Sequence, residues 1–323
     1  DVSDFFAPTA PKTREATAVF FRITEELKQK INRKTLEPSI RLLREYSNLE
    51  KLLGLDSTFK RPVKYELAEP TSAWEAIQMG QQIAEEERQR LQLGTRPIKD
   101  MAELLEIQGV RVIGVAMDED ISGVFMGDDQ IGLSILLNTE HHKFRHAFTL
   151  AHEYCHVLSD RARATVVSSA KTGKDLIEVR ANSFAAAFLL PKTGVEEFFL
   201  SLGKTGATRS YLTSTGASEP ASGEQRRTAS AMQIQLYDVV HLQHYYGVSW
   251  DAAVYRLQNL GCISKDESED LLGKRDEAHA LSRAIKLDTK FSPEEKKFEN
   301  RDFAARFFSL GVDAYRQEII SLK

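Results

Sequence analysis

The spacing of hydrophobic positions is helical at the start of the chain. Before Gly94, apolar side chains recur every three or four positions, which predicts helices. We expect these helices at Thr13–Ile31, Pro38–Leu53 and Trp74–Leu93. The last two stop next to a glycine, the residue preferred just after a helix C-terminus.

The pattern then changes to short strand-like runs. A short helix is expected to begin at Pro97 and to end at Gly109. Three apolar runs separated by Gly and Asp turn residues follow, at Val110–Val115, Ile121–Met126 and Ile131–Leu137. Short strands joined by tight turns predict a small antiparallel sheet or meander.

Helical spacing returns after the strands. Helices are expected at Lys143–Leu158 and Leu176–Leu190, the second one stopped by Pro191. Residues 201–230 are rich in Ser, Thr, Gly and Ala, which is typical of a flexible loop or linker. The remaining expected helices are 231–246, 250–260, 266–287, 293–309 and 311–322.

This order of elements predicts an α+β fold, in which a small antiparallel sheet packs on helices and helical regions flank it on both sides. The expected domains are an N-terminal helical region at 1–70, a core at 71–200, the loop at 201–230, and a C-terminal helical domain at 231–323.

Composition narrows the classes of function. The 43 basic and 47 acidic residues give a net charge of −4, so no global charge favours nucleic acid or an anionic membrane as the main partner. The two cysteines do not make a disulfide framework, which favours a reducing compartment, and we expect a cytoplasmic protein. The clean apolar run Phe184–Leu190 is far shorter than the ~20 residues of a membrane span.

The motif His152-Glu153-Tyr154-Cys155-His156 carries the most specific chemistry. Side chains four apart lie on one helix face, so His152 and His156 can both reach one ion. Glu153 lies about 100° round the helix from His152, where it can take a proton from a water molecule. This spacing is that of zinc peptidases.

A catalytic zinc site needs a third protein ligand and an open position. Ala162 occupies the place where a third histidine would extend the motif, so a downstream carboxylate is expected: Asp160, Asp175 or Glu178. Glu178 is favoured because small side chains follow it in its helix, which can then pack close to the first helix.

Other cysteine and histidine side chains have simpler interpretations. Cys155 is expected to be a small buried apolar residue rather than a ligand. One of the three histidines before the motif, His141, His142 and His146, could stabilise an oxyanion, but structural or solvated roles are expected for them and for His241 and His244.

Two stretches resemble the ImmA/IrrE family of metallopeptidases: FRHAFTLAHEYCH at 144–156 and EVRANSFAAAFLLP at 178–191. The strand at Ile131–Asn138 resembles the family pattern too. The resemblance implies a gluzincin-like peptidase core, Zn²⁺ as cofactor, His152 and His156 as ligands, Glu153 as catalytic residue, and Glu178 as the third ligand.

The resemblance also implies regulated proteolysis, with a helix-turn-helix repressor as protein substrate and induction of stress-response or mobile-element genes. In long members a repressor-like DNA-binding domain precedes the region similar to Val2–Phe6 and Arg41–Leu55. We find no such domain in these residues and expect any to precede Asp1. An extended substrate is expected to pair with an edge strand, at 121–126 or 131–137.

Two alternatives remain at this point. Residues 237–260 have the pattern of a helix-turn-helix and could contact DNA weakly, although residues 231–262 contain only one basic side chain, Arg256. The chain could also be a metal-binding interaction protein without peptidase activity. The oligomeric state is left open.

Overall fold

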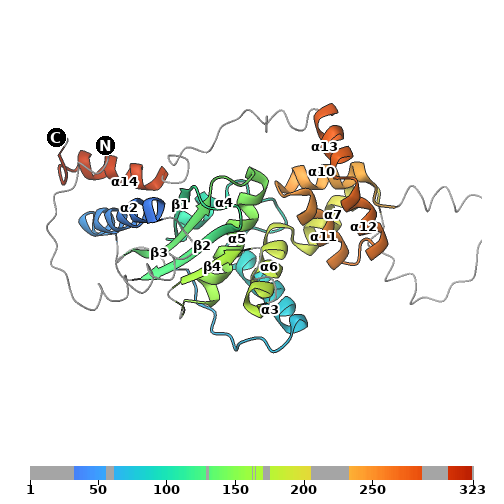
Figure 1. Cartoon of the computed structure of the whole chain (residues 1–323), viewed down its shortest axis with the longest axis horizontal. Coiled ribbons are helices and arrows are strands. Elements are labelled where there is room, and N and C mark those ends of the chain that lie inside the picture. Colours follow the sequence, from blue (N-terminus) through green and yellow to red (C-terminus); the bar gives the residue numbers. More distant parts are fainter. Residues whose placement is uncertain are drawn as a thin grey trace, which may run out of the picture. The chain divides into compact units, whose positions relative to one another are not determined.

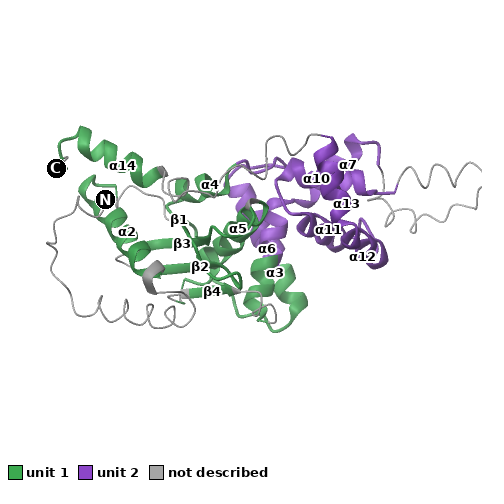
Figure 2. Cartoon of the chain, turned by 45° about the horizontal axis from the view of Figure 1, so that its top comes forward, with its two compact units in different colours: residues 1–78, 100–182, 296–323 green, residues 79–99, 183–295 purple. Residues whose placement is uncertain are grey.

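The computed structural model describes residues 33–55, 62–128, 131–161, 163, 165–169, 175–204, 233–285 and 305–321. The chain divides into two compact units (Figure 2). Unit 1 comprises residues 1–78, 100–182 and 296–323, and unit 2 comprises residues 79–99 and 183–295. Two of the boundaries, after residues 78 and 182, fall within helix α3 (Ala73–Arg90) and helix α6 (Leu176–Leu189). The expected four-domain division stays a prediction.

Unit 1 contains a four-stranded mixed sheet (Figure 1). Its strands lie in the order β1-β3-β2-β4. Strand β3 is parallel to β1 and antiparallel to β2, and β4 is antiparallel to β2. The bounds are β1 Arg111–Val115, β2 Ile121–Asp128, β3 Gly132–Asn138 and β4 Thr165–Ser169. The predicted α+β class is therefore confirmed at this coarse level.

The expectation of a purely antiparallel sheet is wrong, because β3 lies between β1 and β2 and pairs in parallel with β1. Residues 116–120 carry the chain past the end of β3, and the buried side chain of Asn138 holds this crossing. Its amide nitrogen donates to the carbonyls of Asp118 and Ile121, and its oxygen accepts from the backbone of Met117. Side-chain bonds to backbone of this kind are invisible to a reading of hydrophobic spacing.

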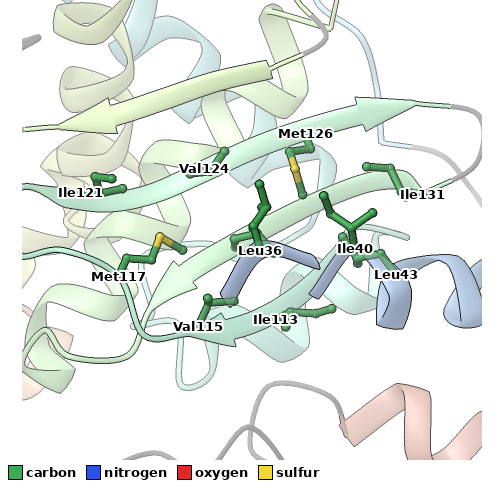
Figure 3. Close-up of a cluster of buried hydrophobic side chains, with 11 residues drawn as sticks. Leu36, Ile40, Leu43, Ile113, Val115, Met117, Ile121, Val124, Met126 and Ile131 are labelled. Atoms are coloured by element: carbon green, nitrogen blue, oxygen red, sulfur yellow. The ribbon is translucent and has the colours of Figure 1, made fainter. Parts of the chain in front are cut away.

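Helix α2 (Arg33–Leu52) covers one face of the sheet, where its side chains form a closed apolar core with three strands (Figure 3). Val124 and Met126 of β2 point into this core, so residue 125 faces the other side. A register irregularity between Ile121 and Gly123 lets Ile121 join the same face. The core consists of Leu36, Ile40, Leu43, Ile113, Val115, Met117, Ile121, Val124, Met126, Ile131 and Leu136.

Helix α5 (Lys143–Ser159) contacts β2 and β3, and helix α4 (Met101–Ile107) contacts both α5 and β1. The C-terminal helix α14 (Ala305–Arg316) packs on α2 through Tyr46 and Phe307, whose ring centroids are 5.6 Å apart. Arg306 donates to the Glu50 carboxylate and to the backbone carbonyl of Glu106. Polar and apolar contacts together therefore hold α14 against the rest of unit 1.

The described elements of unit 2 are helical. Besides the ends of α3 and α6, they are α7 Lys192–Ser201, α10 Leu236–Tyr246, α11 Trp250–Asn259, α12 Lys265–Gly273 and α13 Arg275–Ala284. The single helix expected at 266–287 is wrong, because α12 ends at Gly273 and α13 begins after Lys274. Strand β4 and helix α7 were not expected from the sequence.

The segment with a helix-turn-helix pattern does form two helices, α10 and α11, joined through Gly247 in a left-handed conformation. Its one basic side chain, Arg256, is buried and donates to the carbonyl of Leu190 at 2.9 Å. That guanidinium is not exposed for a phosphate contact, which weakens the case for DNA binding here.

Some expected elements lie outside the described residues: the helix at Thr13–Ile31, most of 201–230, and most of 293–309. Among the helices that the structure does describe, none combines the length and the apolar character needed to cross a membrane.

The carboxyl group of Glu106 gives unit 1 a testable pH dependence. Burial, opposed by the Arg306 charge, raises the pKa of Glu106 from 4.5 to about 7. Since folding disfavours the ionised form, Glu106 contributes stability at low pH that is lost as the pH rises toward about 7. We expect the free energy of unfolding of Glu106→Gln to equal that of the wild type at about pH 4. At about pH 8 it should be higher than that of the wild type by about 2 kcal/mol.

Urea unfolding at both pH values measures this difference. Glu103→Gln on the exposed side of the same helix is the matched control and should show no such pH-dependent gain. An equal effect of Glu106→Gln at both pH values would contradict the assignment.

Candidate metal centre

Helix α5 places His152 and His156 side by side in the interior of unit 1. The helix begins after His142, whose ring accepts from the backbone of Phe144, and it ends before Asp160. Tyr154, Cys155, Val157 and Leu158 are fully buried, so the helix is fixed in the core on most of its circumference. His156 is fully buried and His152 is 6% exposed. The predicted spacing therefore produces two neighbouring imidazoles in a buried place.

Glu178 in the first turn of α6 completes a group of three candidate ligand atoms. Its Oε2 is 3.2 Å from Nε2 of His152, and its Oε1 is 3.4 Å from Nε2 of His156. The two Nε2 atoms are 3.2 Å apart. All three side chains are buried.

These separations fit a tetrahedral Zn²⁺ site. Zinc bonds to imidazole nitrogen and carboxylate oxygen are about 2.0–2.2 Å long, which places neighbouring ligand atoms about 3.3–3.6 Å apart around a tetrahedron. The three observed separations, which involve both oxygens of Glu178, are close to that range, and one atom from each residue lies within 4.8 Å of the others. Two histidines and one carboxylate are also a ligand set of catalytic zinc, which leaves a fourth position open.

Each histidine has a hydrogen-bond partner on its other ring nitrogen. Nδ1 of His152 donates to the Asn182 side-chain oxygen at 2.9 Å, and Nδ1 of His156 donates to Asp160 Oδ2 at 2.8 Å. Arg180 in turn donates to both oxygens of Asp160. Partners of this kind select the tautomer of a neutral imidazole, in which Nε2 would offer its lone pair to a metal.

The structure distinguishes among the three carboxylates that the sequence offered as the third ligand. Asp160 binds His156 and Arg180, and its oxygens are outside the group of ligand atoms. Asp175 accepts from the backbone of Ile177 at the start of α6. Only Glu178 of the three is in the group.

Glu153 lies beside this group without being part of it. It is fully buried, and within the described chain neither carboxylate oxygen has a hydrogen-bond partner. Burial raises the pKa of Glu153, while the imidazoles of His152 and His156 oppose that rise. A buried carboxylate with a raised pKa, placed beside the ligand atoms, is available to exchange a proton.

Gly123 of β2 makes room for Glu153. A Cβ atom at residue 123 would lie 2.9 Å from Glu153 Oε1 and 2.9 Å from Thr149 Cγ2, closer than real Cβ contacts allow. The sequence did not single out this glycine. The one available signal was the position of this glycine inside a strand-like run, since glycine in a strand often marks a close approach of another group.

The charges of the group are strongly coupled. Burial alone would raise the pKa of Glu178, but hydrogen bonds with His152 and His156 lower it to about 2. Burial likewise opposes the positive charge of His156, but Asp160 and Glu178 raise its pKa to about 9. The site therefore favours positive charge at the point where its atoms converge.

The other histidines serve elsewhere. His141 Nε2 bonds the carbonyl of Glu119, and burial lowers the pKa of His146 to about 4. The ring of His241 contacts that of Tyr237 at a tilted angle, and His244 bonds the Ser282 hydroxyl. Cys155 is a buried free thiol whose pKa burial raises to about 12, and it is not among the ligand atoms. Its side chain fits the expected role of a small buried residue.

Comparison with known proteins gives a match to one family over part of the chain. A peptidase family model described as an IrrE N-terminal-like domain matches residues 105–214, about a third of the chain. That segment includes the sheet, α5 and α6, and the three candidate ligand residues. The resemblance to the ImmA/IrrE family is thereby confirmed over this segment. No curated protein was found to match the chain.

Removing Glu178 tests the composition of the group. We expect Glu178→Ala to weaken Zn²⁺ binding by more than about 100-fold, because loss of an outer partner alone costs about 10–100-fold. Elemental analysis after dialysis measures bound metal per chain. Asp175→Ala, which removes the rejected carboxylate at the start of the same helix, should keep the metal. Retention of zinc by Glu178→Ala together with loss by Asp175→Ala would reverse the assignment.

Proposed function

We propose that this protein is a zinc-dependent endopeptidase in which His152, His156 and Glu178 hold the metal and Glu153 is the catalytic residue. The observation that carries the proposal is the convergence of the three buried candidate ligand atoms beside a buried carboxylate. The peptidase-family match over residues 105–214 supports the same reaction class.

The bound Zn²⁺ would supply Lewis-acid polarisation of the peptide carbonyl and would lower the pKa of water. Glu153 takes the proton of the attacking water molecule as oxygen adds to the carbonyl carbon. When the C–N bond breaks, Glu153 delivers that proton to the leaving amine. Its raised pKa suits both steps, since a carboxyl that ionises too readily returns a proton poorly.

The expected pairing of substrate with strand 121–126 or 131–137 is wrong, because β2 and β3 are interior strands of the sheet. The outer strands are β1 and β4. Strand β4 pairs with β2, whose Gly123 adjoins Glu153, so its outer edge is the nearer one to the candidate site. We therefore place an extended substrate segment along β4, where backbone hydrogen bonds would orient the scissile carbonyl.

The substrate that the family resemblance supports is a helix-turn-helix repressor, whose cleavage would induce stress-response or mobile-element genes in the cytoplasm. A repressor unfolded locally into an extended segment would fit the pairing along β4. Incubation with candidate repressors, with and without chelator, followed by mass spectrometry of the fragments, identifies the substrate and the bond cleaved.

Glu153→Gln tests the peptidase assignment against a role in metal binding alone. The amide keeps the shape of the side chain but cannot accept the proton, so we expect zinc to be retained and kcat to fall by about 10²–10⁴-fold. Mass spectrometry of a mixed peptide pool measures new fragments. Glu103→Gln, an exposed change on α4, is the matched control. Cleavage by Glu153→Gln at the wild-type rate would show that another group is the base.

Gly123→Ala tests the position of Glu153. The added methyl group would displace Glu153 or Thr149 by several tenths of an ångström. Since a misplacement of about 1 Å can cost about 10²-fold in rate, we expect at least a tenfold loss of cleavage with about one Zn²⁺ per chain retained. Gly273→Ala, where a Cβ meets nothing within 4 Å, is the control. Unchanged cleavage would mean that Glu153 does not need this space.

A further inference from the structure

A buried ion pair joins the two helices of the candidate metal centre. Asp160 directly follows α5, and Arg180 lies in α6, two residues after Glu178. Arg180 Nη2 is 2.6 Å from one carboxylate oxygen of Asp160 and 2.8 Å from the other. Both side chains are buried. The pair thus connects the helix of the two histidines to the helix of Glu178.

We propose that Asp160 and Arg180 are positioning residues that set the affinity of the centre for a divalent cation, with Arg180 acting through Asp160. This inference rests on the proposed function to the extent that it needs a metal centre, but it does not depend on peptide cleavage.

Asp160 acts on His156 directly. Its Oδ2 accepts from His156 Nδ1 at 2.8 Å, which leaves Nε2 to face Glu178 and His152. A charged acceptor holds the ring more firmly than a neutral one and makes the opposite nitrogen a better donor of electrons to a metal. Asp160 therefore contributes to the metal site without touching the metal.

Arg180 holds Asp160 in the orientation that His156 needs. Its Nη2 contacts both carboxylate oxygens, and burial removes the water that would compete for them. Because Arg180 and Glu178 share the first turns of α6, the same contacts also anchor the third candidate ligand beside α5.

Charge balance gives Arg180 a second effect. Asp160 holds a carboxylate in a buried place, and the guanidinium of Arg180 offsets its charge. An uncompensated buried charge is costly, so loss of Arg180 would disturb the site even though Arg180 is not in the ligand group.

His152 offers an internal comparison. Its partner Asn182 is neutral and exposed, in contrast to the buried and doubly held Asp160. Water can replace an exposed amide at little cost. The partner of His156 should therefore matter more for affinity than the partner of His152.

Titration of the metal-free protein with Zn²⁺ in competition with a chromophoric chelator tests these roles. We expect Asp160→Asn and Arg180→Gln each to weaken binding by about 10–100-fold. The double variant should lose little more affinity than the weaker-binding single variant, because Arg180 acts on the site through Asp160. Asn182→Ala should lose clearly less than Asp160→Asn.

Arg163→Gln is the matched control, because it removes an exposed arginine–carboxylate pair with Glu69 at 2.9 Å in the same unit. Its affinity should equal that of the wild type. Circular dichroism and thermal unfolding of the metal-free variants separate the two roles, since a purely structural pair would lower stability and leave the affinity of the folded protein unchanged. Arg180→Lys keeps the charge but replaces the planar guanidinium with a shorter side chain, so an intermediate affinity is expected.

Wild-type affinity in folded Asp160→Asn and Arg180→Gln would overturn this inference, and so would additive losses in the double variant. If those variants do not fold, Arg180→Lys decides: an affinity equal to the wild type overturns the inference, and a loss supports it. Absence of Zn²⁺ binding by the wild-type protein would instead refute the proposed function.

Discussion

The arrangement of unit 1 depends on one constraint: two imidazole nitrogens and a carboxylate converge in a buried place where they cannot all satisfy one another. The Nε2 atoms of His152 and His156 are 3.2 Å apart, and both face Glu178. A shared positive charge relieves this crowding, and a divalent cation does so for all three atoms at once. The hydrogen bonds on the outer ring nitrogens keep the rings in this orientation.

The other elements of unit 1 hold the side chains of the candidate site in place. Helix α2 covers one face of the sheet with apolar side chains, which leaves the other face to α5. Gly123 lets α5 come close enough to β2 for Glu153 to be enclosed, and the Asp160–Arg180 pair ties α5 to α6. The Glu153 carboxylate and the candidate metal ligands are therefore fixed by different neighbours: the sheet encloses Glu153, and α6 carries Glu178 of the candidate ligand group.

The sequence predicted which side chains of the candidate site lie together better than it predicted the order of the strands. The spacing of His152, Glu153 and His156 is local to one helix, so helical geometry alone foretold their arrangement. Glu178 required the small side chains of α6 and the family resemblance. The place of β3 beside β1 depends on Asn138, a single buried side chain, and hydrophobic spacing carries no information on strand order. Gly123 and Arg180 escaped notice because their partners are distant in sequence, whereas the four-residue spacing of His156 and Asp160 could have indicated their contact.

The central claim is that the three side chains share one metal ion. Anomalous scattering at the zinc edge from crystals of the Zn²⁺-loaded protein measures this directly. The account predicts one peak between His152, His156 and Glu178, about 2.0–2.2 Å from the two Nε2 atoms and a carboxylate oxygen. A peak bound elsewhere, for example at the Cys155 sulfur, or a structure in which the three side chains point apart, would contradict it.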